Sequence, residues 1–301
     1  MAAGTPLGRT VPATLDGKRL DRVLMALFLL TPQRASELIA QGAVFVGRRR
    51  ARHGTQRVRA GQLVRTDPDY VPPPVPSLTD RVLLVDEALL VLDKPAGMPT
   101  GPTLSAAAGT LLFEARRQRL CSFQPCEVHR LDALTSGVVA FVRPGAALRN
   151  LMEQFRQGQV HKRYLCRVHG TAPGAVFVSR APLRQDPRRP QRVLALPEGP
   201  TPAGARAAET HFGLLAQGPG YCDLEARPRT GRTHQIRVHL SALGLPVWGD
   251  PIYGNPALDR QQAPGRLWLH AAELAFRHPV SGRPVVVRAE LPPDMAGFAA
   301  A

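Results

Sequence analysis

The chain has 301 residues, of which 44% are hydrophobic, and its 39 Lys and Arg residues outweigh 23 Asp and Glu residues to give a formal charge of +16. This length fits two domains, or one large domain with an appendage, and the hydrophobic content excludes general disorder. The longest strongly apolar run, at 23–30, is far shorter than the roughly 20 residues that span a bilayer, and the N-terminus has no apolar signal segment, so we expect a cytoplasmic protein without a membrane partner.

The excess of basic residues predicts a polyanionic partner. Lysine occurs only as Lys18, Lys94 and Lys162, so nearly all the bases are arginine. A GC-rich genome explains this use of arginine in place of lysine, but it does not by itself produce more bases than acids. A membrane surface is the rival polyanion, yet the sequence has no basic amphipathic helix with an aromatic face.

Residues 1–10 are expected to form a loose tail, and residues 11–67 a small compact domain. Apolar side chains recur at helical spacing from Leu20 to Phe28. Thr31 and Pro32 are typical of the N-cap and first turn of a second helix, which Gly42 ends. Short strands are expected at 43–46 and 62–65.

This first segment is the most basic part of the chain. Residues 1–67 contain 12 basic and 4 acidic residues, and the resulting charge of +8 is half of the net charge of the protein. A run of charge is usually a solvated face, but this concentration in a small folded unit favours a nucleic-acid surface. The candidate RNA contacts are Arg19, Arg22, Arg34, Arg48, Arg49 and Arg50.

Residues 68–80 contain five prolines within 68–76 and are expected to form a stiff linker. Beyond the linker we expect a helix from about 146 to 157 and strands at 82–85, 89–92, 138–142, 163–168, 222–226 and 285–289. These elements do not alternate as regular βαβ units. We therefore predict an α+β domain over 81–298, with a mixed, largely antiparallel sheet and flanking helices.

The segment 129–137 places one carboxylate, Asp132, in a polar, turn-forming stretch directly before an apolar strand. Loops held at the end of a strand often carry catalytic groups. The alternative interpretation is an Asp that caps a turn and an Arg that pairs with it.

Residues 227–237 contain four arginines around the expected start of a helix, which Thr233 would cap and which would run to Leu243. Helix N-termini and arginines both attract anions, so this segment suits a phosphate backbone or a carboxylate that must stay ionised. A solvated basic loop is the alternative. Tyr164, which follows the cations Lys162 and Arg163, is suited to stack on a base, although a Tyr on a strand is as often a packing residue.

No metal and no cofactor are expected. His234 and His239 are five residues apart, which places them on different faces of either a helix or a strand. Cys121 and Cys126 have no second cysteine pair to complete a zinc site. The sequence also lacks a Walker loop and a G-x-G-x-x-G motif.

Four motifs in this order, LDKPAG at 92–97, HRLDALTSG at 129–137, KRY at 162–164 and GRTHQIR at 231–237, resemble the RluA-type family of pseudouridine synthases. The segment 267–295 is similar to the C-terminal segment of that family. Within 15–67, RLDRVL and TPQRASELIAQGAVFVGRRR resemble the S4-type RNA-binding domain. An S4-like domain before the catalytic domain fits the family members that act on ribosomal RNA.

The resemblance implies an enzyme that breaks the N1–C1′ bond of a uridine in RNA, turns the uracil and rejoins it through C5 without a cofactor. It implies that Asp132 is the nucleophile, attacking either the sugar or the base, and that Arg232 keeps it ionised. Tyr164 would stack on the flipped uracil and help to remove the C5 proton, and Ile236 would pack beneath it. Arg130 would fill the space that the base leaves. The other expected substrate contacts are His129, Thr135, Lys162 and Arg229.

The expected substrate is large-subunit ribosomal RNA, with transfer RNA as the alternative, and the enzyme is expected to be monomeric. Two other functions remain open at this point. One is a ribosome-associated RNA-binding protein whose catalytic domain is inactive. The other is a phosphodiester hydrolase that uses His129 and His234.

Overall fold

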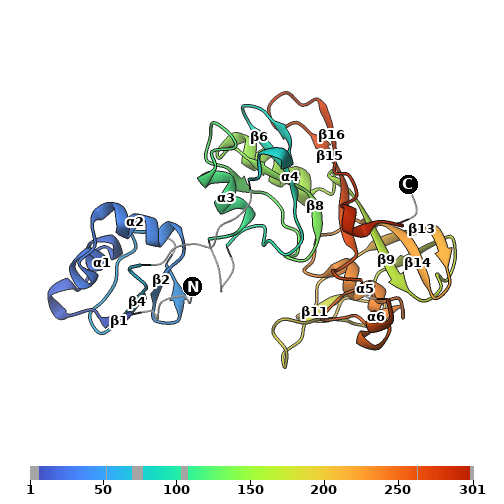
Figure 1. Cartoon of the computed structure of the whole chain (residues 1–301), viewed down its shortest axis with the longest axis horizontal. Coiled ribbons are helices and arrows are strands. Elements are labelled where there is room, and N and C mark those ends of the chain that lie inside the picture. The colour runs from blue at the N-terminus through green and yellow to red at the C-terminus, as the bar shows by residue number, and fades with distance from the viewer. Residues whose placement is uncertain (1–6, 52, 70–76, 103–107, 263, 299–301) are drawn as a thin grey trace. The chain divides into compact units, whose positions relative to one another are not determined.

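The computed structural model describes residues 7–51, 53–69, 77–102, 108–262 and 264–298. The chain divides into two compact units (Figure 1), the first comprising Met1–Leu78 with Gly101–Arg119 and the second Thr79–Thr100 with Leu120–Ala301. Most of the expected linker, at 70–76, lies outside the described residues. The segment Gly101–Arg119 groups with the first unit, whereas the sequence placed it in the domain at 81–298.

The first unit has a four-stranded antiparallel sheet and the predicted pair of helices. The helices are α1 (Leu20–Phe28) and α2 (Pro32–Ala40), and the Thr31 hydroxyl caps α2 by accepting a hydrogen bond from the Arg34 backbone N–H at 3.2 Å. Their apolar faces form one core with residues from the sheet. The strands follow the order β1 (Leu7–Thr10), β4 (Leu63–Thr66), β2 (Val44–Val46) and β3 (Arg49–Arg50), and the unit also holds α3 (Leu111–Arg117).

The expectation of a loose tail at 1–10 is wrong for residues 7–10. Strand β1 pairs antiparallel with β4, with Leu7 opposite Thr66 and Thr10 opposite Leu63. All four side chains of β1 are exposed, so the strand has no apolar alternation that a sequence pattern would reveal. Its backbone hydrogen bonds to β4 hold it in place. Residues 1–6 lie outside the described residues.

The second unit is built on a ten-stranded sheet, and its neighbouring strands are antiparallel except for β8 and β15. The order is β10-β13-β14-β9-β15-β8-β6-β5, with β16 beside β15 and β7 beside β8. This confirms the predicted mixed, largely antiparallel sheet of an α+β fold. The strands are β5 (Val82–Val85), β6 (Leu89–Lys94), β7 (Cys126–Glu127), β8 (Ser136–Val142), β9 (His161–His169), β10 (Val176–Ser179), β13 (Thr210–Gly218), β14 (Tyr221–Pro228), β15 (Leu269–Arg277) and β16 (Pro284–Arg288).

Helices pack against different parts of this sheet. Helix α4 (Ala146–Arg156) buries Ala147 and Leu151 in a cluster with residues of β6, β8 and β15. Helix α5 (Gln235–Ala242) buries Ile236 and Leu240 in a second cluster with residues of β9 and β14. The unit also contains α6 (Pro256–Gln262) and a small hairpin of β11 (Leu183–Gln185) and β12 (Val193–Ala195).

No single helix in the described part of the chain is long and apolar enough to cross a membrane. Helices α1 and α2 reach the required length and apolarity only together, and they are bent by 116° relative to each other. Their apolar residues are buried in the core of the first unit.

Strand β8 pairs with β15 at Gly137, the last residue of the HRLDALTSG motif. Gly137 has a φ of +110°, and a Cβ atom at this position would lie 2.2 Å from the Ala271 carbonyl oxygen. Side chains are disfavoured at this φ, and no side chain fits at this distance. Glycine is therefore required where the motif enters β8.

We predict that Gly137→Ala destabilises the second unit more than Gly145→Ala does. Gly145 has a similar φ of +102°, but a Cβ atom there meets nothing within 4 Å, so its substitution adds only backbone strain of about 1–3 kcal/mol. At Gly137 overpacking adds about 1–3 kcal/mol to that strain. Urea unfolding of both variants measures the difference. Equal losses would show that the contact with β15 does not constrain residue 137.

Candidate active site

The loop that carries Asp132 is fixed by Thr100 and Lys94. The buried Thr100 hydroxyl donates to the Leu131 carbonyl oxygen at 2.9 Å and accepts from the Leu131 N–H at 3.1 Å. The Lys94 Nζ, fully buried at the end of β6, donates to the Ala133 carbonyl oxygen at 2.9 Å. The backbone on both sides of Asp132 is therefore held in place.

Lys94 also donates to the carbonyl oxygens of Pro95 and Met98, at 2.8 and 2.7 Å. Its three acceptors match the three N–H groups of an ammonium. Burial lowers the pKa of Lys94 to about 7, an effect that the negative charge of Asp132 opposes. The lysine of the LDKPAG motif thus joins its own loop to the loop of Asp132.

Arg237 is the guanidinium that contacts Asp132. Its Nη1 donates to Asp132 Oδ2 at 3.0 Å, while its Nε and Nη2 donate to the two oxygens of Asp250 at 2.7 and 2.8 Å. The Arg237 side chain is 3% exposed and that of Asp132 is 25% exposed. Burial disfavours the charged guanidinium, but the hydrogen bonds to Asp250 and the charges of both carboxylates outweigh it and raise the pKa of Arg237. Asp132 therefore lies beside a permanent positive charge.

The predicted ion pair between Asp132 and Arg232 is wrong. The Nε of Arg232 donates to the Ala207 carbonyl oxygen at 3.0 Å, and its backbone N–H donates to Gln235 Oε1 at 3.0 Å. The physical reason is the set of groups around each arginine. Arg232 lies in the loop before α5, where the Ala207 carbonyl oxygen and the Gln235 side chain hold it, whereas Arg237 lies within α5 between Asp132 and Asp250. Helix α5 begins at Gln235, and His234, with a φ of +56°, takes the N-cap position that was predicted for Thr233.

The sequence contained a signal for Arg237 that its motif-based interpretation missed. Arg237 stands in the stretch IRVHL, and every residue from Gln235 to Leu240 is buried. Charged residues are almost never fully buried unless they are paired. An arginine within a short apolar helix therefore predicts a buried acidic partner, and Asp250, also almost fully buried, is that partner.

Tyr164 and Ile236 lie in the same region as Asp132. Tyr164 packs against the apolar cluster that contains Ile236. Burial and the nearby negative charge of Asp132 raise the pKa of the Tyr164 phenol, which keeps the hydroxyl protonated. The structure thus brings a carboxylate, an aromatic ring and an apolar side chain together, as the motif resemblance implies.

Lys162 supports the loop that precedes α5. Its Nζ donates to the Thr230 carbonyl oxygen at 2.9 Å, and burial, together with the charge of Arg232, lowers the pKa of Lys162 to about 8. Gln235 closes the same loop, since its Oε1 accepts from the Thr230 hydroxyl at 2.6 Å and its Nε2 donates to the Glu209 carbonyl oxygen at 2.9 Å. Gln235 was not predicted as a site residue.

Among the other expected substrate contacts, Arg130 and Arg229 are exposed, whereas Thr135 and His129 contact the protein itself. Thr135 is 2% exposed, and its backbone N–H donates to the Asp132 carbonyl oxygen at 3.1 Å. His129 Nε2 accepts from the Ala140 N–H at 2.9 Å, and its ring stacks on Phe155 at 5.1 Å. Thr135 and His129 therefore fix the ends of the loop, a different role from the predicted one.

His234 belongs to a separate network around Tyr253. The Tyr253 hydroxyl accepts from the Val193 N–H at 2.8 Å, so its own proton is available to His234 Nδ1, which lies 2.8 Å away. Burial lowers the pKa of His234, consistent with a neutral ring that accepts at Nδ1. His129 and His234 are thus engaged in different networks, which disfavours the hydrolase that would use them as a pair.

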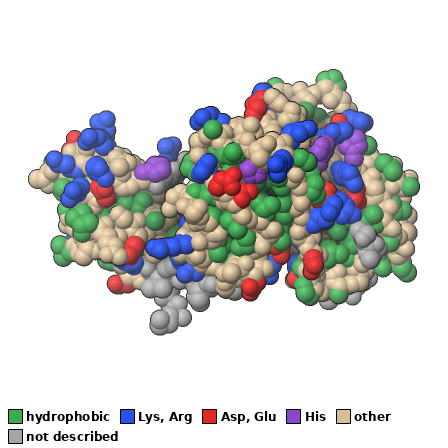
Figure 2. All heavy atoms as spheres, turned by 90° about the horizontal axis from the view of Figure 1, so that it is seen from above, with side chains coloured by type: hydrophobic (Ala, Val, Ile, Leu, Met, Phe, Trp, Pro, Cys, Tyr) green, Lys and Arg blue, Asp and Glu red, His purple; other side chains and the backbone are tan. Residues whose placement is uncertain are grey.

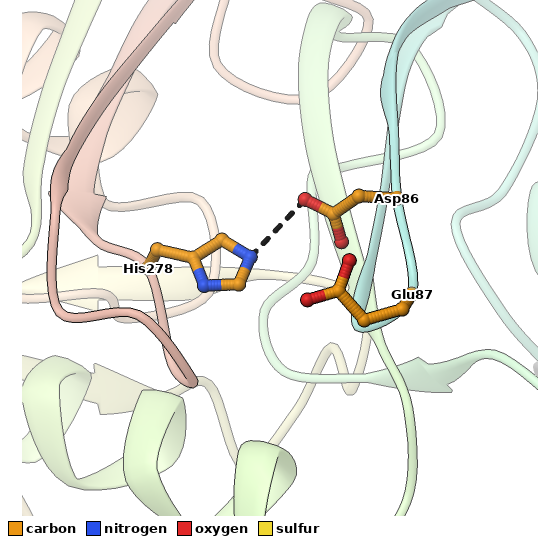
Figure 3. A group of neighbouring side chains, drawn as sticks. All are labelled: Asp86, Glu87 and His278. Atoms are coloured by element: carbon orange, nitrogen blue, oxygen red, sulfur yellow. Dashed lines mark hydrogen bonds and ion pairs between the residues drawn. The ribbon is translucent and has the colours of Figure 1, made fainter.

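Asp86, Glu87 and His278 form another cluster of groups that bind metals in other proteins (Figure 3). His278 Nδ1 accepts from the backbone N–H groups of Val280 and Ser281 at 3.2 and 3.0 Å, so its proton lies on Nε2, which contacts Asp86 Oδ2 at 3.1 Å. Both ring nitrogens are therefore occupied. This geometry joins the turn between β5 and β6 to the turn after β15, and it indicates a structural contact.

We predict that His129→Gln makes folding stability less sensitive to acid while leaving the KM for RNA unchanged. Burial, followed by the charge of Lys162, lowers the pKa of His129 to about 3 from its ordinary value of 6.5. Between these values the unfolded state binds more protons, so stability is lost as the pH falls from 6.5 towards 3. Gln keeps an acceptor for Ala140 but does not titrate. Urea unfolding across this range tests the effect, and an unchanged pH slope would contradict it.

Comparisons with known proteins identify the family of this chain. The RNA pseudouridylate synthase family matches residues 88–242. An uncharacterized RNA pseudouridine synthase of Chloroflexus aurantiacus is 37% identical over 95% of this chain and 90% of its own length. Ribosomal large subunit pseudouridine synthase C of Escherichia coli is 33% identical over 98% of this chain and 96% of its own length.

A solved structure, human RNA pseudouridylate synthase domain containing 1, is 25% identical and superposes with a TM-score of 0.59 over 73% of this chain and 87% of that chain. The fold of the second unit is therefore that of a known enzyme architecture. This chain belongs to the RNA pseudouridylate synthase family, and it is an isomerase that acts on uridine in RNA.

Proposed function

We propose that this enzyme converts uridine to pseudouridine in large-subunit ribosomal RNA. Two relatives support this substrate by name, the large-subunit synthase D of Xanthomonas campestris, 34% identical over 95% of this chain, and synthase C of Escherichia coli. The observation that carries the proposed mechanism is the carboxylate of Asp132, held by Arg237 beside the ring of Tyr164.

The reaction exchanges one bond for another. The N1–C1′ bond breaks, the uracil turns, a C5–C1′ bond forms, and C5 loses a proton while N1 gains one. No electron is transferred overall, so a nucleophile and a site that holds the detached base are sufficient. Asp132 supplies the nucleophile, because only its Oδ2 is hydrogen-bonded within the described residues and Oδ1 remains available to attack the sugar or the base.

The target uridine is flipped out of its stack, because a base within a helix is out of reach of the loop before β8. The Tyr164 ring stacks on the flipped uracil, with Ile236 in the adjoining apolar cluster. Because its hydroxyl is protonated, Tyr164 is better suited to stack on the uracil than to act as a general base. Arg130, exposed two residues before Asp132, occupies the space that the base leaves.

The first unit is an S4-like RNA-binding domain in this proposal. Lys and Arg side chains lie across the surface of this unit on the face shown in Figure 2. The side chains of Arg48 and Arg49 are exposed and make no hydrogen bond or ion pair within the described residues, and Arg22 is exposed as well. These three are the best candidates for phosphate contacts.

The other three arginines predicted to bind RNA contact the protein. Arg19 pairs with Asp21 at 2.6 Å, Arg34 donates to the Pro68 carbonyl oxygen at 2.9 Å, and the guanidinium of Arg50 lies over the Phe45 ring at 4.8 Å. Their contribution to RNA binding is therefore expected to be smaller than that of Arg48 and Arg49.

We predict that Asp132→Asn abolishes turnover, by at least about 10⁴-fold, while RNA binding is nearly unchanged. The amide keeps the shape of the side chain but lacks the nucleophilic charge. Release of tritium from RNA labelled at C5 of uridine measures turnover, and filter binding measures affinity. Near-normal turnover in this variant would remove Asp132 from the mechanism.

We also predict that replacing both Arg48 and Arg49 by Ala weakens RNA binding and makes the slope of log K against log salt shallower by about 1.4–1.8. The reason is that fewer counterions are released on binding when two phosphate contacts are lost. The matched control replaces Arg143 and Arg149 by Ala. Both are exposed and lie beyond the end of β8 that is remote from Asp132, and the change in net charge is the same. Equal slopes for the two double variants would show that net charge, and not this surface, determines binding.

Mapping pseudouridine in total RNA from cells with and without the gene identifies the substrate. The proposal expects one or more sites to disappear from large-subunit ribosomal RNA. Loss of sites from transfer RNA alone would overturn the assigned substrate but not the reaction.

A further inference from the structure

We propose that Asp250 is a positioning residue for the isomerisation, because it fixes the orientation in which Arg237 meets Asp132. This inference rests on the proposed role of Asp132 as nucleophile. Asp250 lies outside the residues 88–242 that match the family, and its role follows from the geometry around Arg237.

The guanidinium of Arg237 donates more hydrogen bonds to one of its two carboxylate partners than to the other. Asp250 takes both Nε and Nη2, at 2.7 and 2.8 Å, and Asp132 receives only Nη1, at 3.0 Å. A guanidinium is planar and rigid, so a bidentate partner on one edge determines where the remaining N–H groups point. Asp250 therefore sets the direction of the hydrogen bond that Asp132 receives.

Asp250 is itself held firmly. Its side chain is fully buried, and its Oδ1 also accepts from the backbone N–H groups of Ile252 and Tyr253, at 2.9 and 3.0 Å. The preceding Gly249 has a φ of +67°, and a Cβ there would lie 1.9 Å from the Arg266 carbonyl oxygen. The Arg237 guanidinium lies 5.2 Å from the centre of the Tyr253 ring. These contacts leave the pair little freedom to rotate.

This division of the guanidinium suits a nucleophile. An arginine that paired with Asp132 through two hydrogen bonds would engage both carboxylate oxygens. With Asp250 in place, Arg237 binds Oδ2 alone and leaves Oδ1 available to the uridine. The buried charge of Asp250 also balances that of Arg237, and Asp132 lies at the partly exposed edge of the site.

The chain contains a second ion pair of the same geometry that serves as a control. Arg167 on β9 donates from Nε and Nη2 to the two oxygens of Asp223 on β14, at 2.6 and 2.8 Å, and the two side chains are 7% and 1% exposed. The rings of Tyr221, Trp248 and Trp268 surround this guanidinium. Neither residue of the pair contacts Asp132 in the described structure.

The test compares Asp250→Asn with Asp223→Asn in the full-length enzyme. Each substitution leaves a buried arginine facing an amide, so both are expected to lower the Tm. Only Asp250→Asn should lower kcat, by about 100-fold, because a small misplacement near the reacting atoms has an effect of that size. Its KM for RNA should stay within about threefold of the wild-type value, since the exposed arginines proposed to bind RNA are unchanged. Asp223→Asn should keep the wild-type kcat when activity is measured well below its Tm.

A double-mutant cycle keeps the proposal testable if Asp250→Asn does not fold. Arg237→Gln with Asp250→Asn replaces the buried charges by neutral amides of similar shape. If Asp250 acts only through Arg237, this double variant has the same kcat as Arg237→Gln within about twofold. A further large loss in the double variant would show that Asp250 acts independently of Arg237 and would overturn the proposal.

Equal kcat values for Asp250→Asn and Asp223→Asn would also overturn it, since they would reduce Asp250 to a structural residue. A separate result tests the proposed role of Asp132 as nucleophile. If Asp132→Asn retains turnover, the nucleophile is misassigned whatever the Asp250 variants do. If Asp132→Asn is inactive and Asp250→Asn has the wild-type kcat, only the positioning role falls.

Discussion

The contact between the Asp132 carboxylate and the Arg237 guanidinium is the interaction on which the site depends. A buried arginine cannot lose its own proton, so Arg237 is a fixed positive charge beside Asp132. Because Arg237 is anchored from its other edge by Asp250, this contact uses only one oxygen of Asp132. The other oxygen of Asp132 makes no hydrogen bond to the described residues.

The fold brings these charges together from distant parts of the sequence. Asp132 lies in the loop before β8, Tyr164 on β9 and Arg237 on α5, and the central sheet holds β8 and β9 on either side of β15. Each loop is fastened by buried polar groups, as Lys94 shows with its three carbonyl acceptors. An isomerisation relies on such placement, since positioned side chains bring the reacting atoms together. The buried polar groups of this unit therefore serve the site as well as the fold.

The sequence predicted what depends on local patterns. Apolar periodicity identified α1, α2 and α4, and the order of motifs identified the family and the reaction. It failed where the outcome depends on tertiary contacts. The sequence predicted Arg232 in place of Arg237, because a motif does not show which of its arginines the fold turns toward Asp132. The N-cap of α5 is His234 and not Thr233, because Thr233 is a plausible cap by residue type and the left-handed backbone of His234 is not visible in a pattern. Polar residues at motif positions were expected to face the substrate, yet His129 faces the protein, since only the fold shows which side of a loop is covered.

A structure of the enzyme bound to an RNA that carries 5-fluorouridine at the target position tests the central claim most directly, because fluorine cannot leave C5 as a proton and the reaction stops with the base in the site. The account predicts a flipped nucleotide stacked on Tyr164, an Asp132 oxygen within about 3.5 Å of the sugar C1′ or the base, and Arg237 still bridging Asp132 and Asp250. A base that remains in its helix, or one that lies against other side chains with Asp132 out of reach, would contradict the account.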